Sequence, residues 1–400
     1  MKLLFLNHNV AWSGTFFRAF QLARSLTRLG HQITVVTTSR TARLGMHREI
    51  RDDVELIEAP DLFWGRGRTG WDPWNIWNRT LEIRSAGFDA IHAFDCRPAV
   101  ILPALYLARK RNLPLFLDWA DWWGRGGTIQ ERDGRLINLL IGGVETWFEE
   151  SFRHHAVGTT VISRALEDRA RSLGVRTDSI LRFPNGCDAD YITPHDQARA
   201  ARAVGLETDT ELIAHVGVVY PSDLSLLLEA FARVVRARPQ ARLALVGNPR
   251  APIPRQMLPA KSLLVPGFVE FPVLQNWLGA ARACVVPLRD TVCNRGRWPG
   301  KVNDYLSAGR AVVMPAVGDA AEWVAGSGAG WTCRPAADAL AESLAAALKD
   351  VDAAQQAGLR GRQLAEGALS WRACSTEVGR FYEKMSRSFT PLVEAEVQAV

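Results

Sequence analysis

Two segments of the sequence gather side chains that could bind or transform a ligand. The first is the run DWADWW at 118–123, in which two carboxylates stand among three indoles. Indole faces pack against the C–H faces of a sugar, and carboxylates accept hydrogen bonds from its hydroxyls. We therefore interpret Asp118 and Asp121 as candidate catalytic groups and Trp119, Trp122 and Trp123 as candidate sugar-binding groups. The alternative is a buried indole cluster whose carboxylates cap a helix or a loop.

The second segment is the most cationic stretch of the chain. It contains Arg289, Arg295, Arg297 and Lys301, surrounds a Pro-Gly pair, and leads into a helical pattern that carries Asp304. Backbone N–H groups at a helix start, with cations beside them, favour a diphosphate. Asp304, one turn further on, could accept hydrogen bonds from two vicinal hydroxyls of a ribose. A solvated basic loop is the competing interpretation.

The elements around these segments predict parallel sheets. A short apolar run at 3–6 is followed by a polar loop with Gly14, a helical pattern that stops at Gly30, and a β-branched run at 33–38. This is a βαβ unit, and ligands of such sheets bind beyond the carboxyl ends of the strands. Gly14 could let backbone N–H groups approach an anion or a sugar hydroxyl, or it could simply permit the turn.

The same alternation continues along the chain and restarts after a linker. The linker is FPNGCDADYITP at 183–194, with two prolines and an Asn-Gly turn. We predict an N-terminal domain at 1–186 and a C-terminal domain at 187–375. Further strands are expected at 90–94, 115–117, 157–162, 212–216, 242–246, 284–286 and 311–314, and helices at 100–110, 136–152, 224–235, 301–308 and 336–357.

Composition limits the class of protein. The chain has 400 residues, 48% of them apolar, and a net charge of +6, which suits two globular domains and gives poor evidence for nucleic-acid binding. Its six cysteines form no CxxC pair, so neither a zinc site nor a disulfide framework is expected. The N-terminal apolar run is too short for a signal peptide and no stretch reaches the roughly 20 apolar residues of a membrane span, so we expect a soluble, cytoplasmic protein.

Several enzyme classes lose support because their motifs are missing. There is no GxSxG, no Walker A motif and no GxGxxG after a strand, which disfavours hydrolases, ATPases and dinucleotide oxidoreductases. His8, His92 and His215 fall in or after strand patterns, where a histidine is more often a core group than a catalyst.

Four stretches of the chain resemble the retaining, family-4-like glycosyltransferases of GT-B fold. They are the Gly14 loop with LARSLTRLGHQITVVTT, the linker FPNGCD at 183–188, the run VPLRDTVCNRGRWPGKVNDYLSAGRAVVMPAVGDAAEW at 286–323, and a final segment ending in FYEKM. The most specific parts are Pro184-Asn185-Gly186-x-Asp188 and Lys301-x-x-Asp304-Tyr-Leu-x-Ala-Gly309.

The resemblance implies an α/β architecture of two Rossmann-like domains facing each other across a cleft. The first would bind the acceptor and the second a nucleotide-diphosphate sugar, while a C-terminal helix in 376–400 returns toward the first domain. Lys301 and Arg297 would hold the diphosphate, Asp304 the ribose, and the segment from Gly318 to Glu322 the sugar end of the donor. Gly14 would lie near the transferred sugar and phosphate.

The chain also departs from the family pattern. Many members carry an Arg and a Lys-Gly after the first strand of the donor domain, where this chain reads GVVYPSD from Gly217 to Asp223. Of the family's glutamate pair separated by seven residues, the second position is Asp304 and the first falls on Gly296. The histidine often found after an acceptor-domain strand is replaced by the DWADWW segment. Gly217 remains a candidate donor-binding residue.

We therefore expect an enzyme that moves a sugar from a nucleotide diphosphate to an acceptor hydroxyl with retention at the anomeric carbon. No metal or other cofactor is expected, because cations replace the metal and no DxD motif stands where the fold would need one. The acceptor is a saccharide, a lipid-linked molecule or a small molecule, and the Trp-rich loop at 64–77 could grip it, touch a membrane surface or fold back as a lid. A nucleotide-sugar epimerase of the same fold and a catalytically silent sugar- or nucleotide-binding partner are the alternatives.

Overall fold

The computed structural model describes residues 1–131, 135–248 and 252–389, and the chain in it divides into two compact units. Unit 1 comprises Met1–Pro184 together with the segment that begins at Trp371, and unit 2 comprises Asn185–Ser370. The linker expected at 183–194 thus contains the division between the units, which falls between Pro184 and Asn185.

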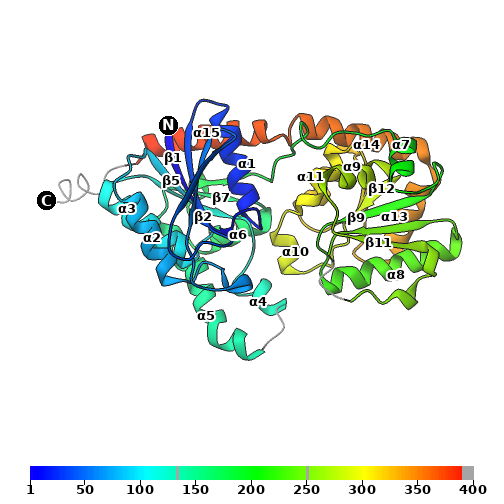
Figure 1. Cartoon of the computed structure of the whole chain (residues 1–400), viewed down its shortest axis with the longest axis horizontal. Helices are drawn as coiled ribbons and strands as arrows, with labels where there is room; N and C mark the ends of the chain where they lie inside the picture. The colour runs from blue at the N-terminus through cyan, green and yellow to red at the C-terminus, as the bar shows by residue number, and fades with distance from the viewer. Residues whose placement is uncertain (132–134, 249–251, 390–400) are drawn as a thin grey trace. The chain divides into compact units, whose positions relative to one another are not determined.

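Unit 1 is built on an eight-stranded sheet (Figure 1). The sheet order is β3-β4-β2-β1-β5-β6-β7-β8, and all neighbours are parallel except β3 and β4. The strands are β1 (Lys2–Val10), β2 (Gln32–Thr38), β3 (His47–Arg51), β4 (Val54–Ala59), β5 (Ala90–Phe94), β6 (Leu115–Trp119), β7 (Gly158–Val161) and β8 (Ile180–Arg182). The β3–β4 hairpin was not among the predicted elements.

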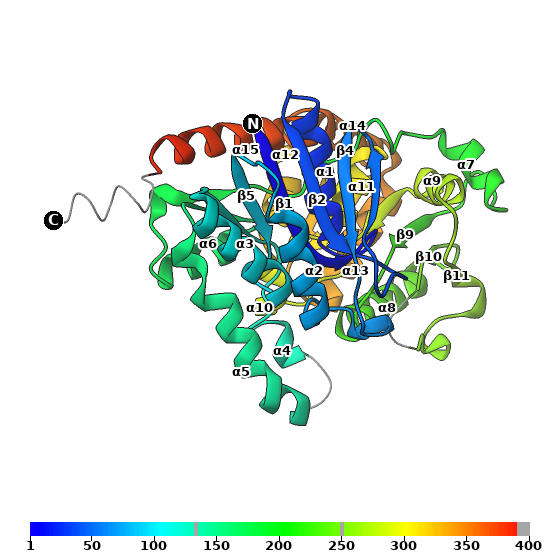
Figure 2. The same cartoon turned by 60° about the vertical axis from the view of Figure 1, so that its left-hand side comes forward.

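Two apolar layers cover the sheet of unit 1. One face packs against α1 (Phe16–Thr27) and α15 (Trp371–Arg387), and the other against α2 (Pro73–Ile83) and α3 (Pro98–Arg111). The remaining helical segments are α4 (Thr128–Glu131), α5 (Arg135–Ser151) and α6 (Arg164–Ser172), with 3-10 turns η1 (Gly65–Gly67), η2 (Arg153–His155) and η3 (Thr177–Ser179). Figure 2 shows α4 and α5 projecting from the body of this unit.

The last helix belongs to the core of unit 1 although it follows unit 2 in sequence. On α15, Tyr382 is fully buried and lies 2.6 Å from His92 Nδ1, and Ser375 Oγ lies 2.7 Å from Ser25 Oγ on α1. Residues from 390 onward, part of the tail expected at 376–400, lie outside the described residues.

Two sequence-based expectations about helices are wrong. Part of the Trp-rich segment expected as a loop is α2, whose start is fixed by Pro73 at the first helical position and by the Asp72 carboxylate, which accepts the Trp74 N–H at 3.0 Å. The single helix expected at 336–357 is two helices, α13 (Ala337–Lys349) and α14 (Val351–Glu366). Asp350 separates them because its side chain accepts the Ala353 N–H at 2.9 Å and so caps a new helix.

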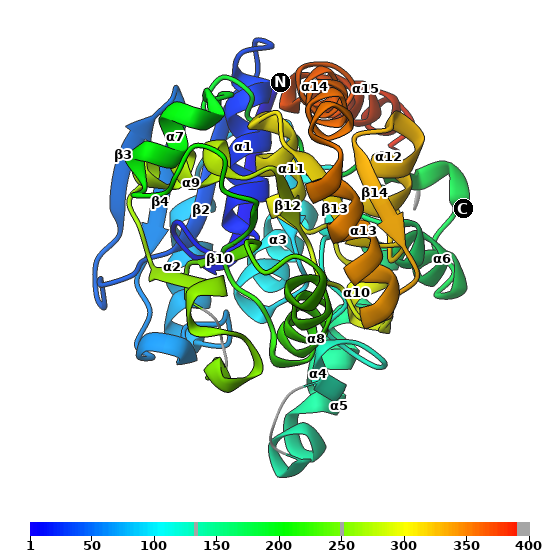
Figure 3. The ribbon, with the colours of Figure 1, turned by 90° about the vertical axis from the view of Figure 1, so that its right-hand side faces the viewer.

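Unit 2 contains a six-stranded parallel sheet in the order β11-β10-β9-β12-β13-β14 (Figure 3). The strands are β9 (Leu212–Val216), β10 (Arg242–Val246), β11 (Leu263–Gly267), β12 (Ala283–Val285), β13 (Ala311–Pro315) and β14 (Gly330–Cys333). Renumbered from β9, this is the 3-2-1-4-5-6 order of the doubly wound fold, whose strand order reverses between β9 and β12. A ligand site is therefore expected beyond the carboxyl ends of these two strands.

The helices of unit 2 enclose that sheet. An apolar cluster joins the strands to α8 (Pro221–Ala237), α13 and α14. The other helical segments are α7 (Gln197–Ala203), α9 (Phe271–Ala280), α10 (Val292–Gly296), α11 (Gly300–Ser307) and α12 (Asp319–Ser327), with 3-10 turns η4 (Arg255–Met257) and η5 (Ala260–Ser262). Pro221 stands at the first helical position of α8, where its missing N–H costs nothing.

Candidate functional site

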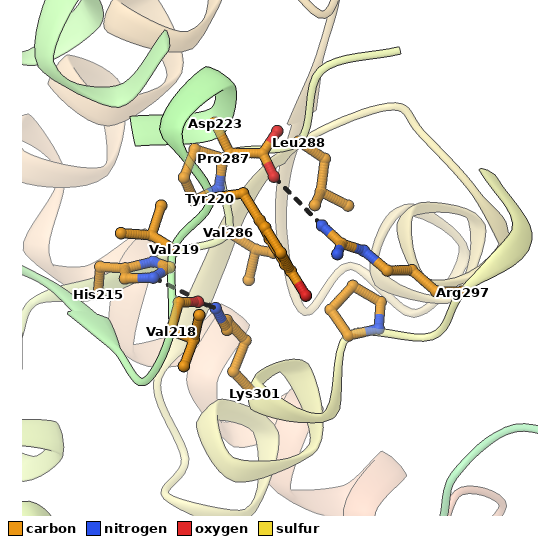
Figure 4. Close-up of a pocket in the computed structure, with 11 residues that line it drawn as sticks. His215, Val218, Val219, Tyr220, Asp223, Val286, Pro287, Leu288, Arg297 and Lys301 are labelled. Atoms are coloured by element: carbon orange, nitrogen blue, oxygen red, sulfur yellow. Dashed lines mark hydrogen bonds and ion pairs between the residues drawn. The ribbon is translucent and has the colours of Figure 1, made fainter. Parts of the chain in front are cut away.

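A pocket of unit 2 lies at the strand-order reversal. It is lined from β9 and the loop after it, from Asp223 in the first turn of α8, from the loop after β12, and from Arg297, Pro299 and Lys301 (Figure 4). The loop after β9 begins at Gly217, whose φ of +86° suits glycine and whose N–H donates to the Val246 carbonyl at 2.7 Å. The pocket thus occupies the place where a doubly wound sheet binds its ligand.

Lys301 is anchored at one side of this pocket. Its ammonium donates to the Val218 carbonyl at 2.6 Å and to His215 Nε2 at 3.2 Å. His215 can accept this bond because its Nδ1 faces the Val285 carbonyl at 2.9 Å, which assigns the proton to Nδ1. Burial lowers the pKa of Lys301 to about 8, with a further contribution from Arg297, and burial beside Lys301 lowers the pKa of His215 to about 3. His215 is therefore a neutral acceptor that fixes a cation.

Arg297 is anchored separately, by a carboxylate. Its Nη2 lies 3.2 Å from Asp223 Oδ2, and its guanidinium carbon lies 5.0 Å from the centre of the Tyr220 ring. Asp223 is only 3% exposed, and its Oδ1 also accepts the Arg289 N–H at 2.9 Å and the Asn294 amide at 3.2 Å. Burial raises the pKa of Asp223, although these donors oppose the shift.

The other two cations of the predicted basic segment do not line the pocket. Arg289 donates through Nε to the Ser222 carbonyl at 2.8 Å, and Arg295 pairs with Asp290 on the surface, with Nη2 at 2.8 Å from Oδ2. The segment is thus neither a solvated basic loop nor a four-cation cluster, because two of its four cations are held inside a pocket.

Asp304 lies one turn beyond Lys301 on α11, half-buried. Burial raises its pKa to about 6; Lys301 opposes this shift and Asp188 adds to it. The neighbouring Asn303 donates to the Asn185 carbonyl at 2.6 Å, so the linker motif around Asn185 and Asp188 is packed onto the helix that carries Lys301 and Asp304. The two most specific motifs of the sequence are therefore adjacent in space.

Gly318 and Glu322 stand at the start of α12, after β13. Gly318 has a φ of +70°, and a Cβ placed on it would lie 3.2 Å from the Asn294 carbonyl oxygen, so its backbone approaches α10 closely. Glu322 is exposed in the first turn of α12. This first turn thus packs near the segment that holds Asp223.

Gly14 lies after β1 at the carboxyl edge of the sheet of unit 1. Its φ is +56°, and a Cβ would come within 2.6 Å of the Asn9 side-chain nitrogen. Asn9 Oδ1 accepts the Thr15 N–H at 3.0 Å, which holds the exposed turn against the strand end. Glycine is required here by backbone geometry and close packing.

Asp118 is buried in an ion pair. Its two oxygens lie 2.9 and 3.0 Å from Arg18 Nε and Nη2, and Thr160 donates to Oδ1 at 2.6 Å. Although burial opposes ionisation, Arg18 holds the pKa of Asp118 below its ordinary value. This carboxylate on β6 binds Arg18 of α1 and Thr160 of β7 and so joins the three elements. Because Asp118 is only 1% exposed, it presents no surface to a ligand. Asp121 lies beyond the strand end and is half-buried.

The three indoles of this segment have different environments. Trp119 is 1% exposed, and the Arg153 guanidinium lies 3.5 Å from the centre of its ring. This indole is therefore part of the packed interior beneath the DWADWW segment. Trp122 and Trp123 are half-buried beyond the strand. The Glu149 carboxylate organises the turn by accepting the Trp119 indole N–H at 3.1 Å and the Trp123 backbone N–H at 2.7 Å.

Sequence reasoning missed Asp223 and Glu149 and weighed His215 only as a core group. Each is a buried polar residue whose role depends on a partner more than 20 residues away, so the neighbouring sequence gives no signal for Asp223 or Glu149. The position of His215 at the end of the strand before a glycine was the available indication.

Comparisons with known proteins agree with this architecture. Residues 13–186 match the model of a glycosyl transferase 4-like domain, and residues 210–350 match that of glycosyl transferases group 1. None of the curated protein sequences matches the chain significantly.

Solved structures with the same fold cover nearly the whole chain. Sucrose-phosphate synthase from Thermosynechococcus elongatus has 17% identity and a TM-score of 0.74, over 97% of this chain and 99% of that one. HepE of Anabaena, in complex with UDP and glucose, has 14% identity and a TM-score of 0.69 over 96% and 100%. The catalytic domain of starch synthase IV from Arabidopsis thaliana, bound to ADP and acarbose, has 13% identity and a TM-score of 0.69 over 96% and 99%. With a 4-like domain in its first half and a group 1 domain in its second, the chain belongs to the glycosyltransferases of GT-B fold.

Proposed function

We propose that this protein transfers a sugar from a nucleotide-diphosphate donor to an acceptor hydroxyl with retention at the anomeric carbon. The observation that carries the proposal is the pair of anchored cations, Lys301 and Arg297, in the pocket at the carboxyl ends of β9 and β12. Two fixed positive charges beside a parallel-sheet edge suit a diphosphate. The solved relatives that contain UDP or ADP support the same class of ligand.

The remaining candidate residues take roles around that diphosphate. Asp304 would accept hydrogen bonds from the ribose hydroxyls, and the first turn of α12 with Glu322 would face the sugar of the donor. In unit 1, the Gly14 turn and the segment with Asp121, Trp122 and Trp123 would orient the acceptor. The cations stabilise the negative charge that develops on the leaving diphosphate, whose oxygen takes the proton of the attacking hydroxyl. Orientation of donor and acceptor supplies much of the remaining rate.

The proposal is tested by following both products. The protein is incubated with UDP-, GDP- and ADP-glucose in the presence of cell-extract acceptors, free nucleoside diphosphate is quantified, and the anomeric linkage is read by NMR. We expect diphosphate release that requires an acceptor and a linkage with the donor's anomeric configuration. An inverted linkage would contradict retention, and an altered donor sugar without acceptor would indicate the epimerase. Nucleotide binding without turnover on any acceptor would indicate the silent binding partner.

We also propose that catalysis needs no metal ion. Within the described residues, no group of three or more His, Cys, Asp or Glu side chains is arranged to hold one. Lys301 and Arg297 would instead neutralise the negative charge of the diphosphate. Transfer should therefore persist in excess EDTA, whereas a loss that Mg²⁺ restores would contradict this part of the proposal.

A membrane-linked acceptor is favoured by a surface of unit 1. A largely apolar groove is lined by Leu102, Leu105, Tyr106 and Phe152 together with two cations, Arg109 and Lys110. Apolar area with adjacent cations suits an anionic bilayer surface. None of the described helices has the length and hydropathy of a bilayer crossing. We expect co-sedimentation with phosphatidylglycerol vesicles and loss of it in Leu102→Glu; binding that survives this change would contradict the assignment.

A further inference from the structure

The two cations of the donor pocket are held by independent anchors. Lys301 is fixed by a backbone carbonyl and a neutral imidazole from the β9 side, whereas Arg297 makes its ion pair with Asp223 in the first turn of α8. Figure 4 shows these two sets of contacts separately. The two sets of hydrogen bonds share no residue, although Arg297 lowers the pKa of Lys301 and Asp223 raises it.

Asp223 is built to hold a guanidinium rather than to meet solvent. One carboxylate oxygen is occupied by the Arg289 N–H and the Asn294 amide, which leaves the other directed at Arg297. Asn294 is itself fixed, because its amide also donates to the Arg289 carbonyl at 2.8 Å. The direction of the carboxylate is thus set by Arg289 from the loop after β12 and by Asn294 on α10.

Arg297 depends on this carboxylate for its direction. Its side chain is 17% exposed, its Nε is buried without a hydrogen-bond partner, and the Tyr220 ring provides only a nondirectional contact. An arginine side chain has large rotamer freedom, so a charged partner is needed to hold it at one place.

We propose that Asp223 is a positioning residue that sets the preference of this pocket for a diphosphate over a single phosphate, by fixing the Arg297 guanidinium as a second phosphoryl contact beside Lys301. The inference rests on the proposed donor site and assigns within it a residue that need not touch the ligand. A monophosphate can use Lys301 alone, whereas the second phosphoryl group needs Arg297 in its fixed direction. The negative charge of Asp223 lowers the combined charge of Lys301, Arg297 and Asp223 from +2 with Asp223 neutral to +1, which weakens the attraction for a diphosphate. We infer that the fixed orientation of Arg297 outweighs this loss of attraction.

The test is the ratio of nucleoside diphosphate to nucleoside monophosphate affinity. UDP, GDP and ADP, each with its monophosphate, are titrated calorimetrically into the full chain and into Asp223→Asn, Arg297→Gln and the double variant. In Asp223→Asn the amide oxygen can still accept from Arg289 and Asn294, but its NH2 faces Arg297 and cannot accept. We expect diphosphate affinity to fall at least fivefold, monophosphate affinity to stay within about twofold, and the double variant to match Arg297→Gln.

Matched controls come from the neighbouring surface pair. Asp290→Asn and Arg295→Gln make the same substitutions in an exposed Asp–Arg pair that does not line the pocket, and they should leave the ratio unchanged. If Asp223→Asn does not fold, as judged by thermal melting, Arg297→Lys is used in its place. This variant keeps the positive charge but loses the planar guanidinium with its paired N–H donors. The ratio of diphosphate to monophosphate affinity should then fall as in Arg297→Gln.

The outcomes separate this inference from the proposed function. An unchanged ratio in Asp223→Asn, tighter diphosphate binding there, additive losses in the double variant, or a wild-type ratio in Arg297→Lys would overturn the role of Asp223 while the donor site stands. Absence of nucleotide binding by the wild-type chain, or binding that Arg297→Gln does not affect, would refute the donor site itself.

Discussion

At the scale of single residues, the charge of the donor pocket depends on the protonation of Lys301. Burial lowers its pKa to about 8, so raising the pH from 7 to 9 converts the ammonium to a neutral amine. Diphosphate affinity should therefore fall about tenfold over that range, measured by calorimetry. In Lys301→Arg, which remains charged throughout, the profile should be flat; a flat profile in the wild-type chain would contradict the assignment.

Asp118 is a second residue for which a structural role can be distinguished experimentally from a catalytic role. Removing its charge leaves the buried Arg18 guanidinium without this carboxylate, although Arg18 still donates to the Phe183 and Pro184 carbonyls. Asp118→Asn should therefore lower the free energy of unfolding of unit 1 by about 3–5 kcal/mol. Asp121→Asn, beyond the strand end, should cost less than about 1 kcal/mol. Both are read from urea denaturation midpoints. An Asp118→Asn protein with wild-type stability and no transfer would instead indicate a catalytic carboxylate.

The residues that could be predicted are those with a local signature. Lys301 and Arg297 lie beside a Pro-Gly helix start, so their types and spacing indicated an anion site, and the structure places both in one pocket. Asp223 gave no such signal, because its partners come from a loop more than 60 residues away. Conversely, nothing local distinguished the buried Asp118 from Asp121, since burial depends on Arg18, a hundred residues earlier.

At the scale of elements, one side chain joins the start of unit 2 to its helices. Arg362 on α14 donates to the carbonyls of Ala189, Ile192 and Ser307 at 2.6–2.9 Å, which ties the second half of the linker to the end of α11. Charged donors to three carbonyls are worth more than one neutral hydrogen bond.

Arg362→Ala should therefore lower the free energy of unfolding of unit 2 by about 2–3 kcal/mol, measured by urea denaturation. Arg360→Ala is the control, because this neighbour on the same helix is exposed and donates to a single carbonyl, that of Gly328. Equal effects of the two substitutions would mean that the segment does not depend on Arg362.

Strands were easier to predict than helix boundaries. The β-branched run at 33–38 and the mostly apolar run at 212–216 coincide with β2 and β9 to within one residue. Both strands are buried on two faces, so their sequences show no alternation of apolar and polar residues. The Asp-Pro pair at 72–73 and the Asp at 350 are helix-start signals that the surrounding tryptophans and alanines obscured. In the β3–β4 hairpin, β3 is mostly exposed and carries no apolar pattern, whereas β4 has buried apolar residues that the prediction overlooked.

At the scale of the whole molecule, the two units differ in whether one continuous fragment of the chain contains all of their core. Unit 2 is one continuous segment with its own core, whereas unit 1 needs Val378, Phe381 and Tyr382 of α15. A fragment of residues 185–370 should fold, and because all pocket residues lie in it, it should bind nucleoside diphosphates with an affinity like that of the full chain.

A fragment of residues 1–184 should lack a cooperative thermal transition, because without α15 its core is exposed. The control joins residues 1–184 to 371–389 through a flexible linker and should restore that transition. Circular dichroism melting measures both. A stable 1–184 fragment would show that α15 is dispensable, and a folded 185–370 fragment that binds no diphosphate would place the donor site elsewhere.

The central claim is that unit 2 binds a nucleoside diphosphate through an anchored ammonium, and calorimetric titration of UDP, GDP and ADP into wild-type and Lys301→Ala protein tests it most directly. The control is Lys349→Ala, which removes an exposed lysine at the end of α13. We expect at least one diphosphate to bind the wild-type and control proteins equally, and the loss of Lys301 to weaken it tenfold or more, about 1.4 kcal/mol. Equal affinity in all three proteins, or no binding to any, would contradict the account.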